Sequence, residues 1–262
     1  MRSSAVVRTS CALLAANELL ACTCTALFTS KTPMSLRATR ATRAPSRLMA
    51  GRELATFDAD DFALPTGAWP YTDADLNRID NSDDASFYDA PRFVTHIDDA
   101  AIESLTEYYR AELAAASAAK GGAPVDVLDL CSSWVSHLPP DAALGRVVGV
   151  GMNEAELTAN PQLTSYVCQD LNKAPRLDRF DDASFDVVCN VVSVDYLTQP
   201  DEVFREMHRL LRPGGVALMS FSNRCFATKA VAMWLQADDI GRLTIVGSYD
   251  NNLVLLFTAC PV

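Results

Sequence analysis

The sequence lacks the cysteine spacing that marks disulfide-stabilised and zinc-binding proteins. Its eight cysteines include no CxxC pair, and the five beyond residue 100 are scattered between Cys131 and Cys260. A disulfide framework or a zinc site requires regularly spaced pairs, so we expect neither, and no metal ion.

Acidic residues are nearly absent from the first 52 positions, which hold eight Lys or Arg and only Glu18 as an acid. The stretch 35–50 (SLRATRATRAPSRLMA) is rich in Ser, Thr, Ala and Arg, which is typical of transit peptides. The apolar run 11–28 is interrupted by Asn17 and Glu18, which disfavours a membrane span but suits a signal preceding a transit segment. We therefore expect residues 1–50 to be a targeting segment that leads to a chloroplast or other plastid, with the mitochondrion as the alternative.

Basic residues are scarce in the rest of the chain, where 14 Lys or Arg face 32 Asp or Glu. An acidic body repels the phosphate backbone and is poorly attracted to anionic lipid. We expect a small-molecule substrate, no nucleic-acid partner and no integral membrane segment in the mature protein. The oligomeric state is left open by the sequence.

The pattern of apolar residues divides the remainder into two parts. Residues 51–97 are rich in Asp, Pro and aromatics, and we expect an irregular N-terminal extension that acts as a possible lid. Apolar residues three and four positions apart predict a helix over 98–119, which Gly121 and Gly122 end. Short apolar runs then predict five buried strands, at 125–130, 146–151, 165–170, 185–190 and 216–221.

Helices are expected between and after these strands. One begins at Pro200 and stops at Arg212-Pro213-Gly214-Gly215, and another covers about 225–236. Two apolar runs, 243–249 and 253–259, flank Asp250-Asn251-Asn252 and predict a hairpin. Residues 98–262 are therefore expected to form an α/β domain: a Rossmann-like, doubly wound, seven-stranded and mostly parallel sheet with a C-terminal antiparallel hairpin.

Glycine is absent between positions 122 and 145, where the first expected strand runs into the loop VLDLCSSWVSHLPP (127–140). Ligands of such sheets bind at the carboxyl ends of the strands, so this loop borders the expected site. A nicotinamide dinucleotide requires close approach of glycine backbone to its pyrophosphate. The loop therefore argues against a dehydrogenase.

Three sequence features together resemble the class I S-adenosylmethionine-dependent methyltransferases, specifically the type 11 group. These are Asp129 near a strand end, the run 180–215 and LRPGGVALMSF (211–221), and the resemblance covers roughly 98–262. The segments 87–99 and 128–139 also resemble a set of plant and algal methyltransferase-like proteins. The family usually has glycine at the positions of Cys131, Ser133 and Val135, where backbone approaches the methionine portion of the cofactor.

The resemblance implies S-adenosyl-L-methionine as the cofactor and assigns a set of residues to it. Asp170 aligns with the acceptor of the adenine amine, and the family's ribose-binding acid aligns with Gly151, so that Asn153 or Glu154 would have to reach over. We expect the loop to keep an ordinary backbone path and to use serine hydroxyls as donors. The implied cofactor-binding residues are Asp129, Cys131, Ser132, Ser133, Asn153, Asp170, Leu171 and Asn190. Asp129 and Asp170 are equally explained as caps of the turns that follow them.

Methyl transfer requires little beyond alignment of the acceptor, with a general base where the acceptor is a hydroxyl or amine. The candidate catalytic residues are His96, His137 and Tyr196, and the candidate acceptor-pocket residues are Tyr88, Arg92, Trp134, Asp195 and Tyr196. The sequence thus predicts a methyltransferase acting on a small molecule. The alternative is a methyltransferase-fold pseudoenzyme or binding protein with a degenerate cofactor loop.

The targeting interpretation predicts where the mature chain begins. N-terminal sequencing of protein isolated from organelles should give a first residue between about 25 and 55, where the basic composition ends. Recovery of an intact segment covering residues 1–30 contradicts the prediction.

Overall fold

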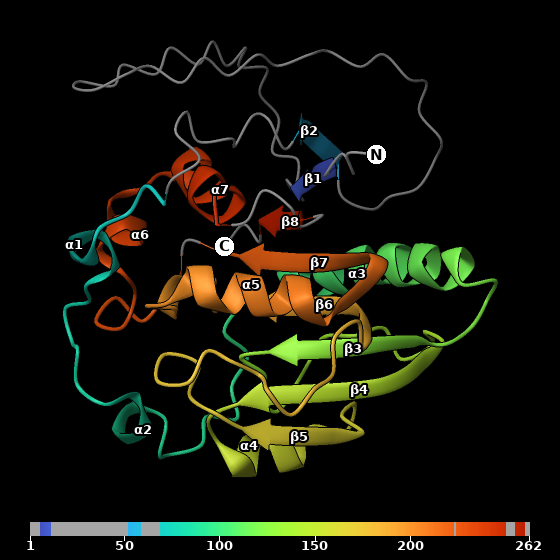
Figure 1. Cartoon of the computed structure of the whole chain (residues 1–262), viewed down its shortest axis with the longest axis horizontal. Helices are drawn as coiled ribbons and strands as arrows, with labels where there is room; N and C mark the ends of the chain where they lie inside the picture. The colour runs from blue at the N-terminus through green and yellow to red at the C-terminus, as the bar shows by residue number, and fades with distance from the viewer. Residues whose placement is uncertain (1–5, 12–51, 59–68, 223, 250–254, 260–262) are drawn as a thin grey trace.

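The computed structural model describes residues 6–11, 52–58, 69–222, 224–249 and 255–259. Within these ranges the strands join in one eight-stranded sheet, in the order β2-β1-β8-β7-β6-β3-β4-β5 (Figure 1). All neighbouring strands run parallel except β1 and β2, which are antiparallel. The strands are β1 Val6–Cys11, β2 Arg52–Asp58, β3 Val125–Leu130, β4 Leu144–Gly151, β5 Ser165–Cys168, β6 Phe185–Val191, β7 Leu211–Phe221 and β8 Leu255–Ala259.

The helices are short apart from α3 and α5. A 3-10 turn, Val194–Tyr196, follows β6. The helices are α1 Asp73–Leu76, α2 Asp84–Phe87, α3 Asp99–Ala119, α4 Glu154–Ala159, α5 Pro200–Leu210, α6 Ala232–Gln236 and α7 Asp239–Gly247. Among the described helices, none has both the length and the apolar character needed to cross a membrane.

The five central strands confirm the predicted parallel sheet. From β3 the chain winds outward through β4 to β5, and then returns to the other side of β3 for β6 and β7. The direction of winding therefore reverses between β3 and β6. In sheets of this kind the reversal opens a crevice at the carboxyl ends of the two strands, which is where ligands bind.

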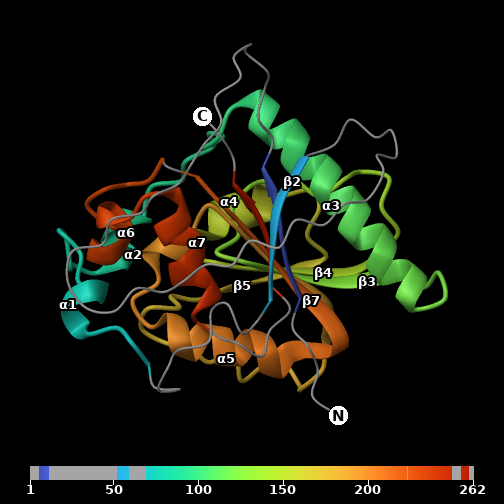
Figure 2. The same ribbon diagram turned by 90° about the horizontal axis from the view of Figure 1, so that it is seen from above.

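Helices cover both faces of the sheet because alternate strand residues point in opposite directions. Val127 and Val187 pack with Leu105 and Tyr109 of α3 on one face. Leu128 and Val188 belong to the cluster on the other face, which includes the buried residues of α5, α6 and α7. Figure 2 shows α3 on one side of the sheet and α5 with α7 on the opposite side. Helix α3 ends where Gly121 and Gly122 adopt φ of 70° and 87°, as the sequence predicts.

The predicted C-terminal hairpin is wrong. Helix α7 occupies most of 243–249, and β8 pairs with β7 in parallel register, as a crossover through a helix requires. Asp250, Asn251 and Asn252 lie outside the described residues. The β-branched run LTIVG suggested a strand, but Asp238 caps a helix by accepting from the Gly241 amide. Burial of Leu243 and Val246 against the sheet then stabilises that helix over its weak intrinsic propensity.

The helix predicted over 225–236 is also shorter than expected, because only Ala232–Gln236 is helical. The preceding residues form a turn that is fixed by contacts outside the segment. The Phe226 amide donates to the Tyr196 hydroxyl at 2.8 Å, and the side chain of Lys229 is fully buried among groups of the extension. These tertiary contacts override the helical spacing seen in the sequence.

Strand β1 falls inside the segment that we expect to be a cleaved leader. It lies between β8 and β2, and it pairs with β8 from Arg8 to Cys11. Cleavage at the predicted position would remove β1 and leave β8 as an edge strand. The leader stays a prediction.

A buried ionic cluster fastens the extension to the domain. The Lys229 ammonium lies 3.1 Å from a carboxylate oxygen of Asp80 and 3.1 Å from one of Asp84. The other Asp84 oxygen accepts from Arg78 at 2.8 Å and from Asn172 at 3.0 Å. Burial alone would raise the pKa of Asp84, but these hydrogen bonds outweigh it and lower the pKa. Asp84 also borders the main cavity, so the cluster sets where the extension meets the site.

We predict that Lys229→Met destabilises the protein by roughly 3 kcal/mol, because it leaves Asp84 buried without one of its two cationic partners. Urea denaturation measures the change. Lys173→Met is the matched control, since its pair with Asp83 is exposed and its loss should have little effect. Equal stability of the two variants contradicts a structural role for the cluster.

Candidate functional site

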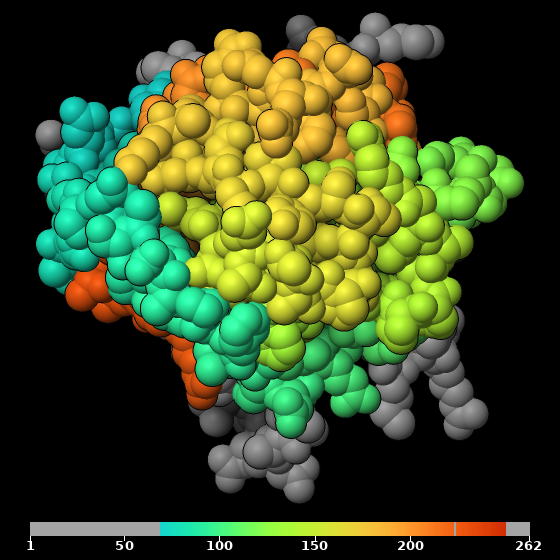
Figure 3. Space-filling model, turned by 90° about the horizontal axis from the view of Figure 1, so that it is seen from below, coloured from blue at the N-terminus to red at the C-terminus, as the bar shows by residue number. Residues whose placement is uncertain are grey.

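A cavity of about 340 Å³ lies at the carboxyl ends of β3, β4, β5 and β6. Its volume is within the usual range of small-molecule sites. The extension closes one side of it: Figure 3 shows the blue-green extension lying against the yellow-green surface near α4. The sequence-predicted residues that line it are Tyr88, Arg92, His96, Asp129, Cys131, Ser132, Ser133, Trp134, His137, Asn153, Asp170, Leu171 and Tyr196. Asn190 and Asp195 are not among its lining residues.

Asp129 is the buried centre of the loop that follows β3. One of its oxygens accepts from the Ser132 and Ser136 hydroxyls at 2.6 and 2.7 Å, and the other lies 3.6 Å from the Cys189 sulfur. Burial raises the pKa of Asp129 to about 6, although the three hydrogen bonds oppose the rise. The carboxylate therefore caps its own loop, which was the structural alternative for this residue.

The loop does not follow the ordinary backbone path that we expected. Cys131 has a φ of 56° and His137 a φ of 54°, a left-handed conformation that costs such residues about 1–2 kcal/mol each. The Ser132 hydroxyl is taken by Asp129, and the Ser133 hydroxyl donates to Glu156 at 2.5 Å. Both hydroxyls are therefore engaged inside the protein. Cys131 thus adopts a backbone conformation that glycine tolerates at little cost, and burial raises the pKa of its thiol to about 12.

The loop also explains why residue 151 is a glycine. A Cβ at Gly151 would lie 2.2 Å from the Ser132 carbonyl oxygen, so no acid fits at the position where the family carries one. Asn153 does not replace that acid. It caps α4 by accepting from the Glu156 amide, and its amide group donates to the carbonyls of Tyr88 and Asp89. Glu154 lies on the exposed surface instead, beside Tyr166.

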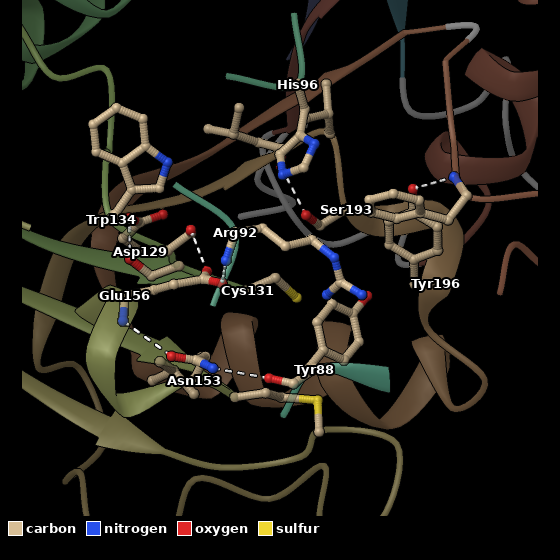
Figure 4. A pocket seen from close by; sticks show the side chains of 18 of the residues that line it. Tyr88, Arg92, His96, Asp129, Cys131, Trp134, Asn153, Glu156, Ser193 and Tyr196 are labelled. Atoms are coloured by element: carbon tan, nitrogen blue, oxygen red, sulfur yellow. Dashed lines mark hydrogen bonds between the residues drawn. The ribbon is translucent and has the colours of Figure 1, made fainter. Parts of the chain in front are cut away.

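Glu156 links the loop to the extension. Its two oxygens accept from the Ser133 hydroxyl and from the Arg92 amide, the latter at 2.7 Å (Figure 4). The Trp134 indole donates to the Val94 carbonyl at 3.1 Å, which adds a second link. The sequence did not point to Glu156 as a residue of the site. The only signal for it was its place three residues after Asn153, which is the spacing of a capping box.

Asp170 follows the end of β5 by two residues and lines the cavity. One oxygen accepts from the Asn172 amide at 2.9 Å, while Oδ2 is buried and has no hydrogen-bond partner among the described residues. The nearest cation, the Lys173 ammonium, is 3.9 Å from it. Leu171 is also buried and borders the cavity. Asn190 instead lies beneath the site, where its amide donates to the Leu130 carbonyl at 3.3 Å.

The three catalytic candidates all line the cavity but differ in chemistry. Burial lowers the pKa of His96 and of His137, so both rings are neutral near pH 7 and can accept a proton. Burial raises the pKa of Tyr196, whose hydroxyl already accepts from the Phe226 amide. Tyr196 is therefore a poor proton acceptor. Burial likewise raises the pKa of Asp195 to about 8, and its main-chain oxygen accepts from Val231.

Comparison with known proteins agrees with this geometry. Residues 128–219 match the family model described as "Methyltransferase domain", and this range holds the central strands and the loops that border the cavity. These 92 residues, about a third of the chain, are thus similar to a methyltransferase domain. The methyltransferase domain therefore includes Asp129, Asp170 and the altered loop, whereas the extension that closes the cavity lies outside the matched range.

One curated relative and several solved structures show similarity to this methyltransferase domain. A malonyl-[acyl-carrier protein] O-methyltransferase of Marinomonas sp. (strain MWYL1) is 28% identical over 76 residues. That stretch is 29% of this chain and 27% of the relative, so the match spans about a quarter of each.

Three of the similar solved structures each match only part of this chain. An S-adenosylmethionine-dependent methyltransferase of Mesorhizobium loti is 21% identical, with 36% of this chain and 45% of that chain covered and a TM-score of 0.30. A protein of Pyrococcus horikoshii is 25% identical, with 51% and 64% covered and a TM-score of 0.34. A SAM-dependent methyltransferase of Archaeoglobus fulgidus is 15% identical, with 42% and 51% covered and a TM-score of 0.31.

The buried Asp129 carboxyl predicts a specific pH dependence. Its pKa of about 6 exceeds the ordinary 3.8, so the folded state binds this proton more tightly than the unfolded chain does. Its contribution to stability is therefore fully present below about pH 4 and is lost as the pH rises through about 6, a change of roughly 3 kcal/mol. Asp129→Asn cannot titrate, so the difference in free energy of unfolding between variant and parent should shift in favour of the variant by most of this amount as the pH rises from about 3 to about 7. Parallel denaturation profiles for the two proteins contradict the prediction.

Proposed function

We propose that this protein is an S-adenosylmethionine-dependent methyltransferase that acts on a small molecule in a plastid. The observation that carries the proposal is the buried Oδ2 of Asp170 at the cavity, which has no hydrogen-bond partner among the described residues. A buried carboxylate oxygen without a donor is costly, and an exocyclic amine of a purine would supply that donor. Asp170 occurs where the resemblance places the acceptor for adenine, which supports the same reading.

Residues of this chain would bind the cofactor, accept a proton from the acceptor and exclude water. S-adenosylmethionine, when bound, supplies a methyl group that its sulfonium has already activated. Asp170 and Leu171 would hold the adenine, and the loop from Cys131 to His137 would border the methionine portion. His96 can accept a proton from a hydroxyl or amine acceptor, because its lowered pKa keeps the ring neutral. The extension excludes water from the cavity through its links to Glu156 and Trp134.

The altered loop favours a second candidate, a pseudoenzyme that binds a different ligand. The serine hydroxyls are engaged within the protein, and the Ser132 carbonyl lies over Gly151 where the ribose-binding acid would stand. Both features reduce the number of groups that remain for the ribose and methionine ends of the cofactor. Measured cofactor affinity separates the two candidates.

We predict that the protein binds S-adenosylhomocysteine and that Asp170→Ala weakens this binding by roughly 1–3 kcal/mol, through loss of one hydrogen bond to a buried amine. Isothermal titration calorimetry measures both affinities. Asp178→Ala is the control, because Asp178 is exposed and pairs with Arg176 away from the cavity.

Two results count against the proposal. Undetectable binding by the folded parent at millimolar ligand supports the pseudoenzyme. Equal affinity of the Asp170 and Asp178 variants removes Asp170 from the site even if the parent binds.

A further inference from the structure

The Arg92 side chain borders the cavity, and it forms no ion pair with an acidic residue among the described residues. One guanidinium nitrogen, Nη2, donates to the Phe87 carbonyl at 2.8 Å, whereas Nη1 is buried and has no hydrogen-bond partner in the described part of the chain. The guanidinium carbon lies 4.5 Å from the centre of the Phe87 ring, 5.6 Å from that of Phe226 and 5.8 Å from that of Tyr88. The aromatic rings pack around the guanidinium but offer Nη1 no hydrogen-bond acceptor, so that nitrogen still requires one.

Glu156 of α4, the acid that accepts from the main-chain amide of Arg92, does not pair with the guanidinium. Glu156 binds the main-chain amide of Arg92 and the Ser133 hydroxyl, so both of its oxygens are engaged. A guanidinium stays charged at all relevant pH values, and a buried donor without a partner is costly. Lys229, the buried cation beside this site, shows the usual solution, with two carboxylates at 3.1 Å. The missing partner of Arg92 is therefore expected to come from a ligand.

We infer that Arg92 binds an anionic group of the methyl acceptor, a carboxylate or a phosphate, and that the rings around it favour an acceptor with an apolar or aromatic body. A planar guanidinium edge matches the two oxygens of a carboxylate. Figure 4 shows the Arg92 side chain reaching over Tyr88 toward Tyr196, within the cavity. The inference names the substrate class of the proposed methyltransferase and rests on that proposed function.

The acceptor is favoured over the cofactor's own carboxylate as the source of the anion. The rings that hold the guanidinium come from the extension and from the segment after β7. The resemblance places the methionine portion of the cofactor at positions 131–135, and no ring contact of the guanidinium comes from that loop. The two sources can be separated by probes that contain or lack each carboxylate.

The test titrates four probes into the full-length protein. Two are S-adenosylhomocysteine and 5′-methylthioadenosine, which lacks the amino-acid carboxylate, and the other two are benzoate and inorganic phosphate, each in the presence of saturating S-adenosylhomocysteine. Arg92→Met should weaken benzoate binding by roughly 10- to 100-fold, the cost of losing a charged hydrogen bond. It should leave the affinities of the two nucleosides unchanged. Arg205→Met carries the same change of net charge on the exposed face of α5 and should bind benzoate like the parent.

Several outcomes overturn the inference. One is a selective loss of S-adenosylhomocysteine affinity with 5′-methylthioadenosine unaffected, which assigns Arg92 to the cofactor. Another is benzoate binding that depends on Arg224, the exposed arginine at the cavity, and not on Arg92. Absence of benzoate binding by the parent, with inorganic phosphate also failing to bind, overturns it as well.

Two further measurements keep the test decisive. Arg92→Lys retains the charge but not the planar edge, so it should recover part of the benzoate affinity if Arg92→Met disturbs folding. If the parent binds benzoate through Arg92 in a titration without S-adenosylhomocysteine and fails to bind the nucleosides, the anion site stands and the methyltransferase proposal fails. If the nucleosides bind and benzoate binding does not depend on Arg92, the anion site fails alone.

Discussion

The hydrogen bonds to the buried Asp129 carboxylate fix the loop on which the whole site depends. The Ser132 and Ser136 hydroxyls converge on one oxygen and hold the chain in a path with two left-handed residues, Cys131 and His137. That path brings the Ser132 carbonyl over Gly151 at the end of β4. A glycine-rich loop would need no such support, because glycine adopts positive φ at little cost. Here the hydrogen bonds from the Ser132 and Ser136 side chains stabilise the left-handed residues instead.

The extension forms one wall of the cavity, and hydrogen bonds link it to the loop after β3 and to α4. The loop and this wall are therefore coupled. Glu156 accepts from Ser133 of the loop and from the Arg92 amide of the extension. Asn153 and Trp134 donate to carbonyls of the extension on either side of that contact. The Lys229 cluster independently fastens the part of the extension around Asp80 and Asp84. A change in the loop is therefore expected to move the groups that face the ligand, including the guanidinium of Arg92.

The sequence predicted the parallel core because local and tertiary signals agree there. The runs 125–130 and 185–190 are apolar on both faces, and helices cover both faces of these strands. It failed at 243–249 and at 225–231, where contacts distant in sequence decide the conformation. The approximate position of the cavity was predictable from strand ends, and Asp129 and Asp170, which lie near the ends of two of those strands, both line it. The roles of Glu156 and Ser136 were not, because their partners lie 23 and 7 residues away and follow from the loop's unusual path.

The charged groups that border the cavity indicate what kind of ligand it binds. The acids at its border are largely satisfied: Asp84 by two cations, Asp129 by hydroxyls and Glu156 by a hydroxyl and an amide. Among the described residues that line the cavity, two buried polar atoms have neither a hydrogen bond nor an ion pair closer than 3.9 Å, the Oδ2 of Asp170 and the Nη1 of Arg92. One requires a donor and the other an acceptor. A donor such as an amine at one and an anion at the other satisfies both, which is the arrangement expected of a site that holds a nucleoside cofactor and an anionic acceptor together.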